Sequence, residues 1–550
     1  MTKYKYWLLG ISLTAAVLFS FSQVENDRYF EIVKNLDIFA TLFKEVNSYY
    51  VDEINPGQLM RTGIDAMLNS LDPYTDYIPE DDIEDYRTIT TGEYGGIGAV
   101  VDEKNGISTI VMPYEGYPAF EAGLIAGDQI MKINGIDISD KNPEERSRLL
   151  KGQSRSSINL TIRRPYKNEE FEVEVQREKI TIDNVPYYGM VTTDIGYIKL
   201  TDFTTEAGNE VKNALKKLKH EGATKVVLDL RENPGGLLEE AVNVSNVFVP
   251  KGSEIVTTKG KLNNWTKTYN ALNEPVDTQM PLVVLASNGS ASASEIVSGV
   301  IQDYDRGVLV GQRTYGKGLV QQTRPLAYNS QLKVTTGKYY IPSGRCIQAI
   351  DYSHRNPDGS VGKIPDSLKN KFKTSGGRVV YDGGGVNPDI EVEKEKLAPI
   401  TYSLIRNDLI FDYATKYFYS HEKIKSPKEF SLSDQEYQEF SEWLKTKEYD
   451  YTTQVEKDIE KLISSAKKEN YYDDIKEQIY ALQRETLHNK DQDLKTFKEE
   501  IKSLLEQEIA GRYYYKNGIV EASFKHDNEI TEAINILNNP TAYQDLLNSN

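Results

Sequence analysis

Three serines and one lysine stand out because of the residues around them. Ser290, Ser292 and Ser294 alternate with alanine directly before a helix-like stretch, and Lys317 follows between two glycines. A serine hydroxyl becomes a good nucleophile only when a base removes its proton. A lysine can act as that base when it is neutral, which requires an apolar environment that lowers its pKa. The pattern predicts a serine hydrolase with a lysine base, and chemistry alone leaves the choice among the three serines open.

A second turn could stabilise the negative charge that develops on the attacked carbonyl oxygen. A serine at a helix start lies beside free backbone N–H groups and the positive end of the helix dipole. The turn Asn233-Pro234-Gly235-Gly236 follows another buried strand and could supply a further N–H group without a side chain in the way. Glu295 is interpreted as a first-turn acid that stabilises the helix start.

Histidine, cysteine and metal chemistry find little support in the sequence. The histidines lack the spacing of metal ligands; they are His220, His354, His421, His488 and His526. A histidine-dependent esterase or lipase would carry a Gly-x-Ser-x-Gly elbow, which the serine run does not have. Cys346 is the single cysteine, so the chain forms no intramolecular disulfide and no zinc cluster. We expect no metal and no cofactor.

Composition limits the partners of the chain. The formal net charge is −18, so the surface repels phosphate backbones and we expect no nucleic-acid partner. Lys3 and Lys5 precede an uncharged apolar run at residues 7–21. This pattern predicts that residues 1–24 are a signal peptide or an uncleaved anchor, and that the protein is exported to the periplasm or cell envelope.

The rest of the chain divides into four regions by pattern. Residues 25–91 read as helices, including one at residues 56–70, and residues 92–179 read as a small β-rich module. Residues 180–392 alternate strands and helices, which predicts an α/β fold with a mostly parallel sheet. Residues 393–550 are rich in Lys, Glu and Tyr and read as helices, for example at residues 491–509. This helical extension is either a solvated appendage or a surface for an adaptor or for self-association.

The β-rich module resembles a PDZ domain. It opens with Gly95-Gly96-Ile97-Gly98, continues through Gly127-Asp128 and Asn134-Gly135, and closes with a strand at residues 159–164. In such a domain the backbone N–H groups of the opening loop hold a peptide's terminal carboxylate, while the peptide adds as an extra strand. The resemblance implies that Gly95, Gly96, Ile97 and Gly98 bind peptide.

The whole pattern closely resembles the carboxyl-terminal processing peptidases, or tail-specific proteases. The matching motifs follow in order between residues 35 and 392 and are Asn69 to Pro73, the PDZ module, Asp229 to Gly236, Gly289 to Ile296, Gln302-Asp303, Thr314 to Gln321, and Gly385 to Ile390. Members of this family are serine proteases with a Ser–Lys pair and an inserted PDZ domain.

The resemblance assigns roles residue by residue. Ser292, the middle serine, is the nucleophile, Lys317 is the general base, and Gln321 orients the lysine. The N–H groups of Ala293 and of Gly235 or Gly236 form the oxyanion hole. Lys151 is counted among the peptide-binding residues. The family often has an arginine at this position that can link ligand binding to activation, and a lysine does not reproduce that coupling role.

The expected function is an exported serine endopeptidase that binds the free C-termini of proteins or peptides and cuts near the tail. A different class remains as the alternative, namely a catalytically silent PDZ scaffold that binds peptides. The intact set of Ser292, Lys317 and Gln321 argues against that alternative.

Overall fold

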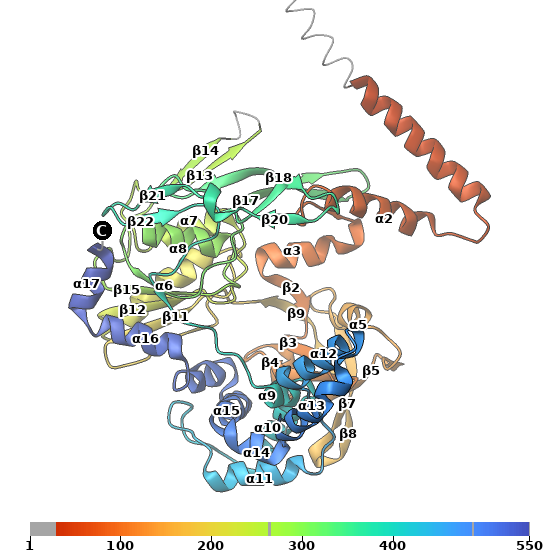
Figure 1. Cartoon of the computed structure of the whole chain (residues 1–550), viewed down its shortest axis with the longest axis vertical. Coiled ribbons are helices and arrows are strands. Elements are labelled where there is room, and N and C mark those ends of the chain that lie inside the picture. The colour runs from red at the N-terminus through yellow and green to blue at the C-terminus, as the bar shows by residue number, and fades with distance from the viewer. Residues whose placement is uncertain (1–28, 262–265, 487–488, 549–550) are drawn as a thin grey trace, which may run out of the picture. The chain divides into compact units, whose positions relative to one another are not determined.

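A computed structural model describes residues 29–261, 266–486 and 489–548 (Figure 1). The chain divides into two compact units, Met1–Tyr77 and Ile78–Asn550. The predicted export segment at residues 1–24 lies outside the described residues. Among the helices that are described, none is long and apolar enough to cross a membrane.

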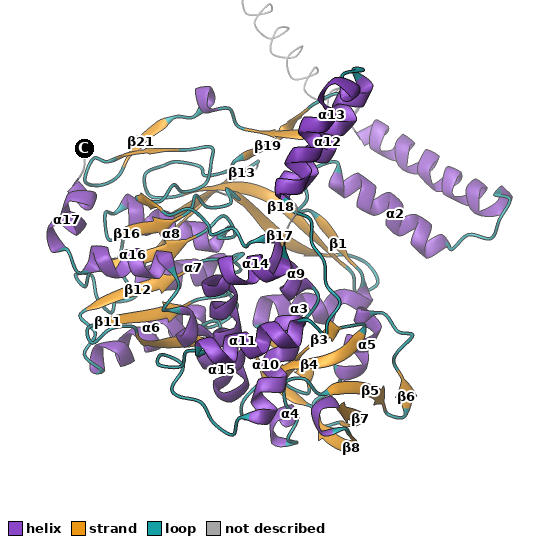
Figure 2. Ribbon diagram, turned by 60° about the horizontal axis from the view of Figure 1, so that its bottom comes forward, coloured by secondary structure: helices purple, strands orange, loops and turns teal. Residues whose placement is uncertain are grey.

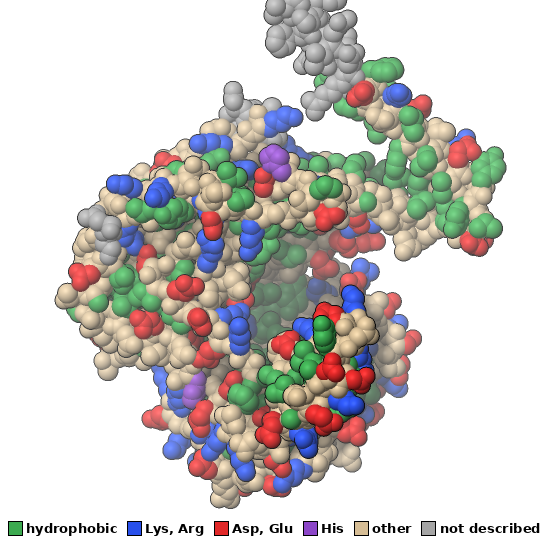
Figure 3. All heavy atoms as spheres, viewed as in Figure 1, with side chains coloured by type: hydrophobic (Ala, Val, Ile, Leu, Met, Phe, Trp, Pro, Cys, Tyr) green, Lys and Arg blue, Asp and Glu red, His purple; other side chains and the backbone are tan. Residues whose placement is uncertain are grey.

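Two helices lie in the part of the first unit that the structure describes. Residues 29–49 are helical, and apolar side chains such as Phe30, Val33 and Leu36 are exposed on them (Figure 3). The second helix, α2 (Pro56–Asn69), confirms the prediction for residues 56–70. It starts there because Pro56 suits the first helical turn and the Asn55 side chain accepts the Gln58 N–H at 3.1 Å.

The β-rich module of the second unit has the sheet order β3-β4-β5-β7-β8. Its sheet strands are β3 (Ala99–Lys104), β4 (Ile107–Pro113), β5 (Gln129–Ile133), β7 (Ser157–Arg164) and β8 (Glu169–Gln176), and β6 (Ile136–Asp137) pairs with β5. Its helices are α4 (Pro118–Glu121) and α5 (Pro143–Leu150). Alternate residues of β7, Ile158, Leu160 and Ile162, are fully buried, as expected for a strand with one face on a core. The helix α3 (Ile83–Thr91) leads into β2 (Glu93–Gly96), which pairs with β9 (Glu178–Thr181) where the chain leaves the module.

A six-stranded sheet with the order β10-β11-β12-β15-β16-β23 forms the centre of the protease-like region. The strands are β10 (Tyr187–Met190), β11 (Ile195–Lys199), β12 (Lys225–Asp229), β15 (Leu282–Ala286), β16 (Val308–Gly311) and β23 (Ile390–Glu391). All neighbours are parallel except β10 and β11. The predicted α/β fold with a mostly parallel sheet is therefore confirmed, and its turns meet at the carboxyl ends of the strands.

Helices cover both faces of this sheet (Figures 1 and 2). The core on one face includes side chains from α6 (Ala207–His220), α7 (Leu238–Asn246) and α8 (Ala293–Asp303). The core on the other face includes Ile530, Ala533 and Leu537 of α16 (Asn528–Leu537) and Tyr543 of α17 (Pro540–Asn548). Sheets buried on both faces have nearly continuous apolar strands, as β15 has.

A second, antiparallel sheet packs over α8, and in it β13 pairs with β14 and with β18, while β17 pairs with β18. Its strands are β13 (Glu254–Gly260), β14 (Lys267–Asn270), β17 (Leu319–Pro325) and β18 (Gln331–Tyr340). Two small hairpins follow in the chain, formed by β19 (Ile350–Arg355) with β20 (Val361–Lys363) and by β21 (Lys371–Lys373) with β22 (Val379–Tyr381) (Figure 2).

The C-terminal extension has its own apolar core as well as the two helices on the sheet. It contains α9 (Pro399–Arg406), α10 (Leu409–Ser420), α11 (Asp434–Leu444), α12 (Gln454–Lys468), α13 (Tyr472–Thr486), α14 (Lys490–Thr496) and α15 (Lys498–Ser523), followed by α16 and α17. The helix predicted at residues 491–509 is two helices, because the chain breaks at Phe497. The extension is helical, as predicted, but its last helices are part of the protease core rather than a solvated appendage.

The extension also contacts the PDZ-like module. Lys104 Nζ lies 3.0 Å from Asp408 Oδ1, at the start of α10. The ring of Tyr166 stacks on Tyr419 of α10 with 5.5 Å between ring centroids. The same helical region therefore touches both the module and the central sheet.

Candidate active site

Ser292 lies in the turn between β15 and α8, which we call the serine turn (residues 287–294). Its backbone has φ 54° and ψ −111°, a strained conformation for a residue with a side chain. Such strain is typical of functional turns, because it aims one side chain away from the surrounding packing. Ser292 is partly exposed, at the N-terminus of α8.

The structure separates Ser292 from the two neighbouring serines. Ser290 and Ser294 are fully buried. The Ser290 hydroxyl donates to the Leu230 carbonyl at 2.7 Å, and the Ser294 hydroxyl donates to the Asn233 carbonyl at 2.9 Å. Both side chains therefore hold the turn in place, which leaves Ser292 as the serine that a ligand can reach.

Glu295 connects the serine turn to the segment that carries Lys317. Its fully buried carboxylate accepts the N–H groups of Ser292 at 2.9 Å and of Lys317 at 2.8 Å. The same carboxylate accepts the Gly316 N–H at 2.7 Å and the Thr314 hydroxyl at 2.6 Å. Burial raises the pKa of Glu295, although these four donors act against it. Glu295 is therefore a first-turn acid at the helix start, as predicted, and in addition it binds the segment that carries Lys317.

Tyr339 on β18 makes a second connection between the same two residues. Its hydroxyl lies 3.1 Å from the carbonyl oxygen of Ser292 and 2.5 Å from that of Lys317. The N–H groups of Ser292 and Lys317 are therefore bonded to one carboxylate, and their carbonyl groups are bonded to one hydroxyl. The sequence pointed to Glu295 only as a helix-start acid and did not point to Tyr339. The Ser-x-x-Glu spacing of a capping box points to Glu295, whereas nothing in the sequence points to Tyr339.

Gln321 lies on β17, four residues after Lys317. Its amide nitrogen donates to Thr335 Oγ1 on β18 at 3.2 Å, so the neighbouring strand fixes the side chain. The structure thus brings Ser292 and Lys317 together at the start of α8, and it places Gln321 on the strand that follows Lys317.

The glycine turn (residues 233–236) packs directly against the serine turn. Gly235 has φ +97°, and a Cβ atom there would lie 2.9 Å from Ser292 Cβ and 2.8 Å from the Ala293 nitrogen. The Gly235 N–H already donates to Asn233 Oδ1 at 2.8 Å. Among the residues that the structure describes, the N–H groups of Gly236 and Ala293 have no hydrogen-bond partner.

Asn233 joins the two turns. It is fully buried, and its Nδ2 donates to the Leu200 carbonyl at 2.8 Å. Its own carbonyl accepts the Ala291 N–H at 3.0 Å and the Ser294 hydroxyl at 2.9 Å. A shift of one turn must therefore shift the other.

Asp229, at the end of β12, is a buried carboxylate beneath the glycine turn. Tyr197 Oη donates to it at 2.5 Å, Lys199 Nζ lies 3.2 Å away, and Arg231 Nη2 donates at 2.6 Å. Burial by itself would raise the pKa of Asp229, but Arg231 and Lys199 outweigh it and hold the pKa well below its usual range. Asp229 therefore stays negatively charged at the end of β12, and Arg231 and Lys199 balance its charge.

The PDZ-like module contains a groove of about 200 Å³ between β3 and α5. Gly96, Ile97 and Lys151 line this groove, whereas Gly95 and Gly98 are not among its lining residues. The Gly95 carbonyl instead accepts the Gly152 N–H at 3.0 Å. Lys151 Nζ lies 2.7 Å from Asp85 of α3, so the groove borders an ion pair to the segment before the module.

Metal ligation and thiol chemistry find no support in the part of the chain that the structure describes. Within residues 29–261, 266–486 and 489–548, no three His, Cys, Asp or Glu side chains are grouped as metal ligands. Cys346 is half-buried, and burial raises the pKa of its thiol, which disfavours the reactive thiolate.

Known protein families match three parts of the chain. Residues 194–361 match the model for peptidase family S41, and residues 109–164 match the model for a PDZ domain. Residues 400–537 match a model described as "Probable PDZ-protease, C-terminal helical domain".

Individual relatives extend over most of the chain. The carboxy-terminal-processing protease of Bartonella bacilliformis is 36% identical over 376 residues, which are 68% of this chain and 85% of that protein. A protein of Staphylococcus aureus described as "Probable CtpA-like serine protease" is 37% identical over 57% of this chain and 62% of its own length. The solved photosystem II D1 C-terminal processing protease aligns at 25% identity and a TM-score of 0.34, over 66% of this chain and 93% of that one.

These matches confirm the resemblance that the motifs indicated. The Bartonella protease is matched over 85% of its own length at 36% identity, and the S41 and PDZ models match separate parts of the chain. The chain belongs to the carboxy-terminal-processing protease family of S41 serine peptidases.

Proposed function

We propose that this peptidase is an exported endopeptidase that captures the free C-termini of proteins in its PDZ groove and cleaves near the tail. Ser292 is the nucleophile and Lys317 is the general base. One observation carries this assignment: the backbones of both residues are anchored to the same two side chains, Glu295 and Tyr339. Two residues far apart in sequence are thereby held as one unit.

The proposed reaction is an acyl transfer to Ser292. Its Oγ attacks the carbonyl carbon of the scissile bond while Lys317 Nζ accepts the hydroxyl proton. The N–H groups of Ala293 and Gly236 donate to the oxyanion, since the Gly235 N–H is already bound to Asn233. Lys317 returns the proton to the leaving amine, and a water molecule then hydrolyses the acyl-enzyme through the same groups. Gln321 is assigned to orient Lys317.

The proposed substrate class follows from the PDZ groove. An extended tail would pair with β3, and its terminal carboxylate would lie against the loop that contains Gly96 and Ile97. Lys151 at the groove edge offers a positive charge, although its pair with Asp85 must compete with the peptide.

Export rests on the N-terminal pattern of the sequence alone. Lys3 and Lys5 before the apolar run at residues 7–21 support secretion into the periplasm or cell envelope. Fractionation of cells that make the full chain, with N-terminal sequencing of the product, distinguishes a cleaved signal from a retained anchor and from a cytoplasmic protein.

The nucleophile is tested with Ser292→Ala and a matched serine on the same helix. Ser298 of α8 is buried, and its hydroxyl has no hydrogen-bond partner among the described residues, so Ser298→Ala removes no hydrogen bond. We expect Ser292→Ala to lose at least about 1,000-fold in kcat on an unstructured peptide, as nucleophile removal does in serine proteases. Ser298→Ala should stay within about twofold.

A fluorophosphonate probe adds a direct readout, since it labels only an activated serine. Labelling of the wild type and of Ser298→Ala, but not of Ser292→Ala, is the expected pattern. Cleavage by Ser292→Ala within tenfold of the wild type would refute the assignment.

A further inference from the structure

A large cleft separates the protease core from the C-terminal extension. Its volume is about 990 Å³. The core side is formed by residues at the carboxyl ends of parallel strands, among them Lys199, Arg231, Ser287 and Gln312. The opposite side is formed by α15, by the start of α16 and by the linker at residues 393–397. The cleft therefore borders Ser287, the first residue of the serine turn, and the two residues Arg231 and Glu232 that lie just before the glycine turn.

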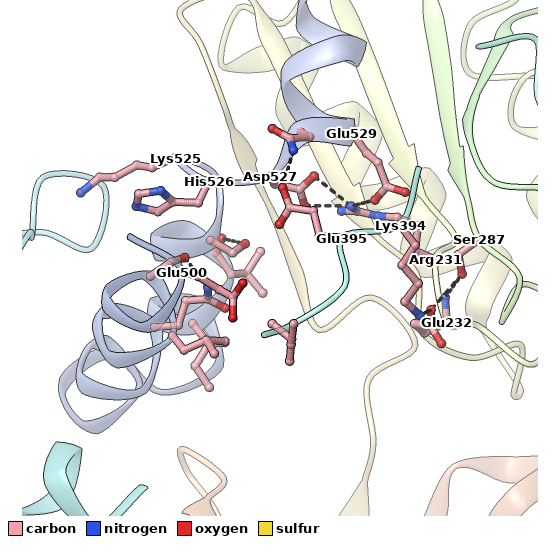
Figure 4. Close-up of a pocket in the computed structure, with 18 of the residues that line it drawn as sticks. Arg231, Glu232, Ser287, Lys394, Glu395, Glu500, Lys525, His526, Asp527 and Glu529 are labelled. Carbon is pink, nitrogen blue, oxygen red and sulfur yellow. Dashed lines mark hydrogen bonds and ion pairs between the residues drawn. The ribbon is translucent and has the colours of Figure 1, made fainter. Parts of the chain in front are cut away.

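Arg231 crosses this cleft from the core to the extension (Figure 4). On the core side its Nε and Nη2 donate to Asp229 at 3.0 and 2.6 Å. On the extension side its Nη1 lies 2.8 Å from Asp527 Oδ2 and also contacts the Glu529 carboxylate. Only 13% of the Arg231 side chain is exposed, so this guanidinium is largely desolvated. A desolvated charge depends on its partners, and two of the three come from the extension.

The two extension acids are held in fixed positions. Asp527 caps α16, because its Oδ1 accepts the Ile530 N–H at 2.9 Å. Glu529 in the first turn of α16 also binds Gln312, which follows β16. Because α16 packs on the central sheet, the backbone that carries both acids is held in place.

Arg231 lies within the segment that holds the serine turn. The residue before it, Leu230, accepts the Ser290 hydroxyl at 2.7 Å. The residue after it, Glu232, has φ 59°, and its N–H donates to Ser287 Oγ at 3.0 Å. Any movement of Arg231 therefore reaches the serine turn from both sides, as well as the glycine turn that follows.

We propose that Asp527 and Glu529 are positioning residues for hydrolysis, and that the extension completes the active site by holding Arg231. Their carboxylates fix the guanidinium, and Arg231 in turn fixes the glycine turn against Ser292, so that the Gly236 and Ala293 N–H groups converge. The inference rests on the proposed role of Ser292. It gives the extension a task in the chemical step that is separate from any partner binding.

The test removes the two charges and keeps the shapes. Asp527→Asn retains the cap of α16, because asparagine caps helices as well as aspartate does. Glu529→Gln retains the length and an acceptor oxygen. We expect the double variant to lose about tenfold to a hundredfold in kcat on an unstructured peptide, with KM changed by less than about threefold. Its rate of fluorophosphonate labelling should fall by a similar factor, since labelling needs the same oxyanion donors.

Glu521→Gln is the matched control. Glu521 is another acid on the extension that contacts the core, where it accepts the Tyr187 hydroxyl at 3.0 Å on β10, the edge strand of the sheet. If contacts between the extension and the core only stabilised the fold, Glu521→Gln and the double variant would have the same kinetics whenever their melting temperatures were equal. We expect the control to keep kcat and labelling within about twofold of the wild type.

If the double variant does not fold, the single variant Asp527→Asn replaces it in the test. The single variant should also lose kcat, but by a smaller factor. Re-introducing a carboxylate with Asp527→Glu should restore part of the rate. Variants that cleave and label like the wild type would overturn the positioning role alone. A wild-type chain that neither cleaves nor labels would overturn the proposed function and the positioning role together.

Discussion

Glu295 shows how much one side chain contributes to this site. It is the only group that bonds to the N–H of both Ser292 and Lys317 within the described residues, and it is completely buried. Its Oε2 accepts both of these N–H groups, and its Oε1 accepts the Gly316 N–H and the Thr314 hydroxyl, so both oxygens must be acceptors. An amide of the same shape has one accepting oxygen and one donating nitrogen, so it would face N–H groups with another N–H group.

We therefore predict that Glu295→Gln separates the two proposed catalytic residues. At least one buried N–H group loses its acceptor, which costs about 1–3 kcal/mol of folding free energy. The expected loss in kcat is about a hundredfold or more, measured on an unstructured peptide, because Lys317 no longer lies in register with Ser292. Urea unfolding measures the accompanying loss of stability.

Glu210→Gln is the comparison for this prediction. Glu210 in the first turn of α6 also accepts a loop N–H, that of Val185 at 2.8 Å, and burial raises its pKa as well. It should lose stability but keep its kcat. Equal kcat for both variants would mean that Glu295 only stabilises the fold.

At this scale the sequence predicted residue types better than residue roles. It singled out Ser290, Ser292 and Ser294 together, since all three precede one helix. They differ only in tertiary partners, which are the Leu230 and Asn233 carbonyls for the outer two. These partners come from a strand end about sixty residues earlier in the chain, as the separations of 60 and 61 residues show. No local pattern contains that information, and the choice of Ser292 came from the family resemblance.

Among the elements, the glycine turn carries the tightest constraint. Gly235 combines φ +97° with a site where a Cβ atom would lie 2.7 Å from the Ala291 carbonyl oxygen. The first property strains any other residue, and the second would push the two turns apart. The turn and the strand end before it were predicted from the sequence, because glycine after a buried strand is a strong local signal.

We predict that Gly235→Ala abolishes activity through this clash rather than through backbone strain. Gly222 provides the control, because it has φ +105° and no atom within 4 Å of the place where a Cβ would be. Gly222→Ala should lower the free energy of unfolding by about 1–2 kcal/mol and leave kcat unchanged. Gly235→Ala should lose at least about a hundredfold in kcat. If both variants lost the same small factor, the close approach of the two turns would have no bearing on catalysis.

Helix boundaries were harder to predict where tertiary contacts decide them. The apolar spacing at residues 491–509 indicated one helix, whereas the structure has α14 and α15 with a break at Phe497. Phe497 packs against the core of the extension, so packing rather than helix propensity sets the break. By contrast, α2 follows its sequence signal, since Asn55 caps it locally.

The whole molecule uses its extension as a layer of the protease core. Ile530, Ala533 and Leu537 of α16 cover one face of the central sheet, next to Val283 and Val310. The sequence predicted the helices of this region but not their place, because an amphipathic helix does not specify which surface it covers. Without α16 and α17 the central strands would expose one apolar face, so the extension and the core are expected to fold together.

The extension also anchors the PDZ-like module, which leads to a prediction about substrate capture. Lys104 of β3 pairs with Asp408 of α10 at 3.0 Å and with Asp102 of the module itself at 3.2 Å. The Asp408 side chain is 13% exposed and that of Asp102 is 61% exposed. Asp408→Asn should therefore loosen the module by about 1 kcal/mol or more, whereas Asp102→Asn should have little effect.

The measurement is the ratio of kcat/KM for a folded protein with a free C-terminal tail to that for the same protein with an amidated tail. Amidation removes the charge that the loop at Gly96 and Ile97 would bind, so the wild type should prefer the free tail by about tenfold. In Asp408→Asn this preference should shrink, since a tail held by a loosely placed module reaches Ser292 less often. Asp102→Asn should keep it, and both variants should cleave a short unstructured peptide at the wild-type rate. An unchanged ratio in Asp408→Asn would show that α10 does not set the position of the module, and equal cleavage of both tails by the wild type would remove the capture hypothesis itself.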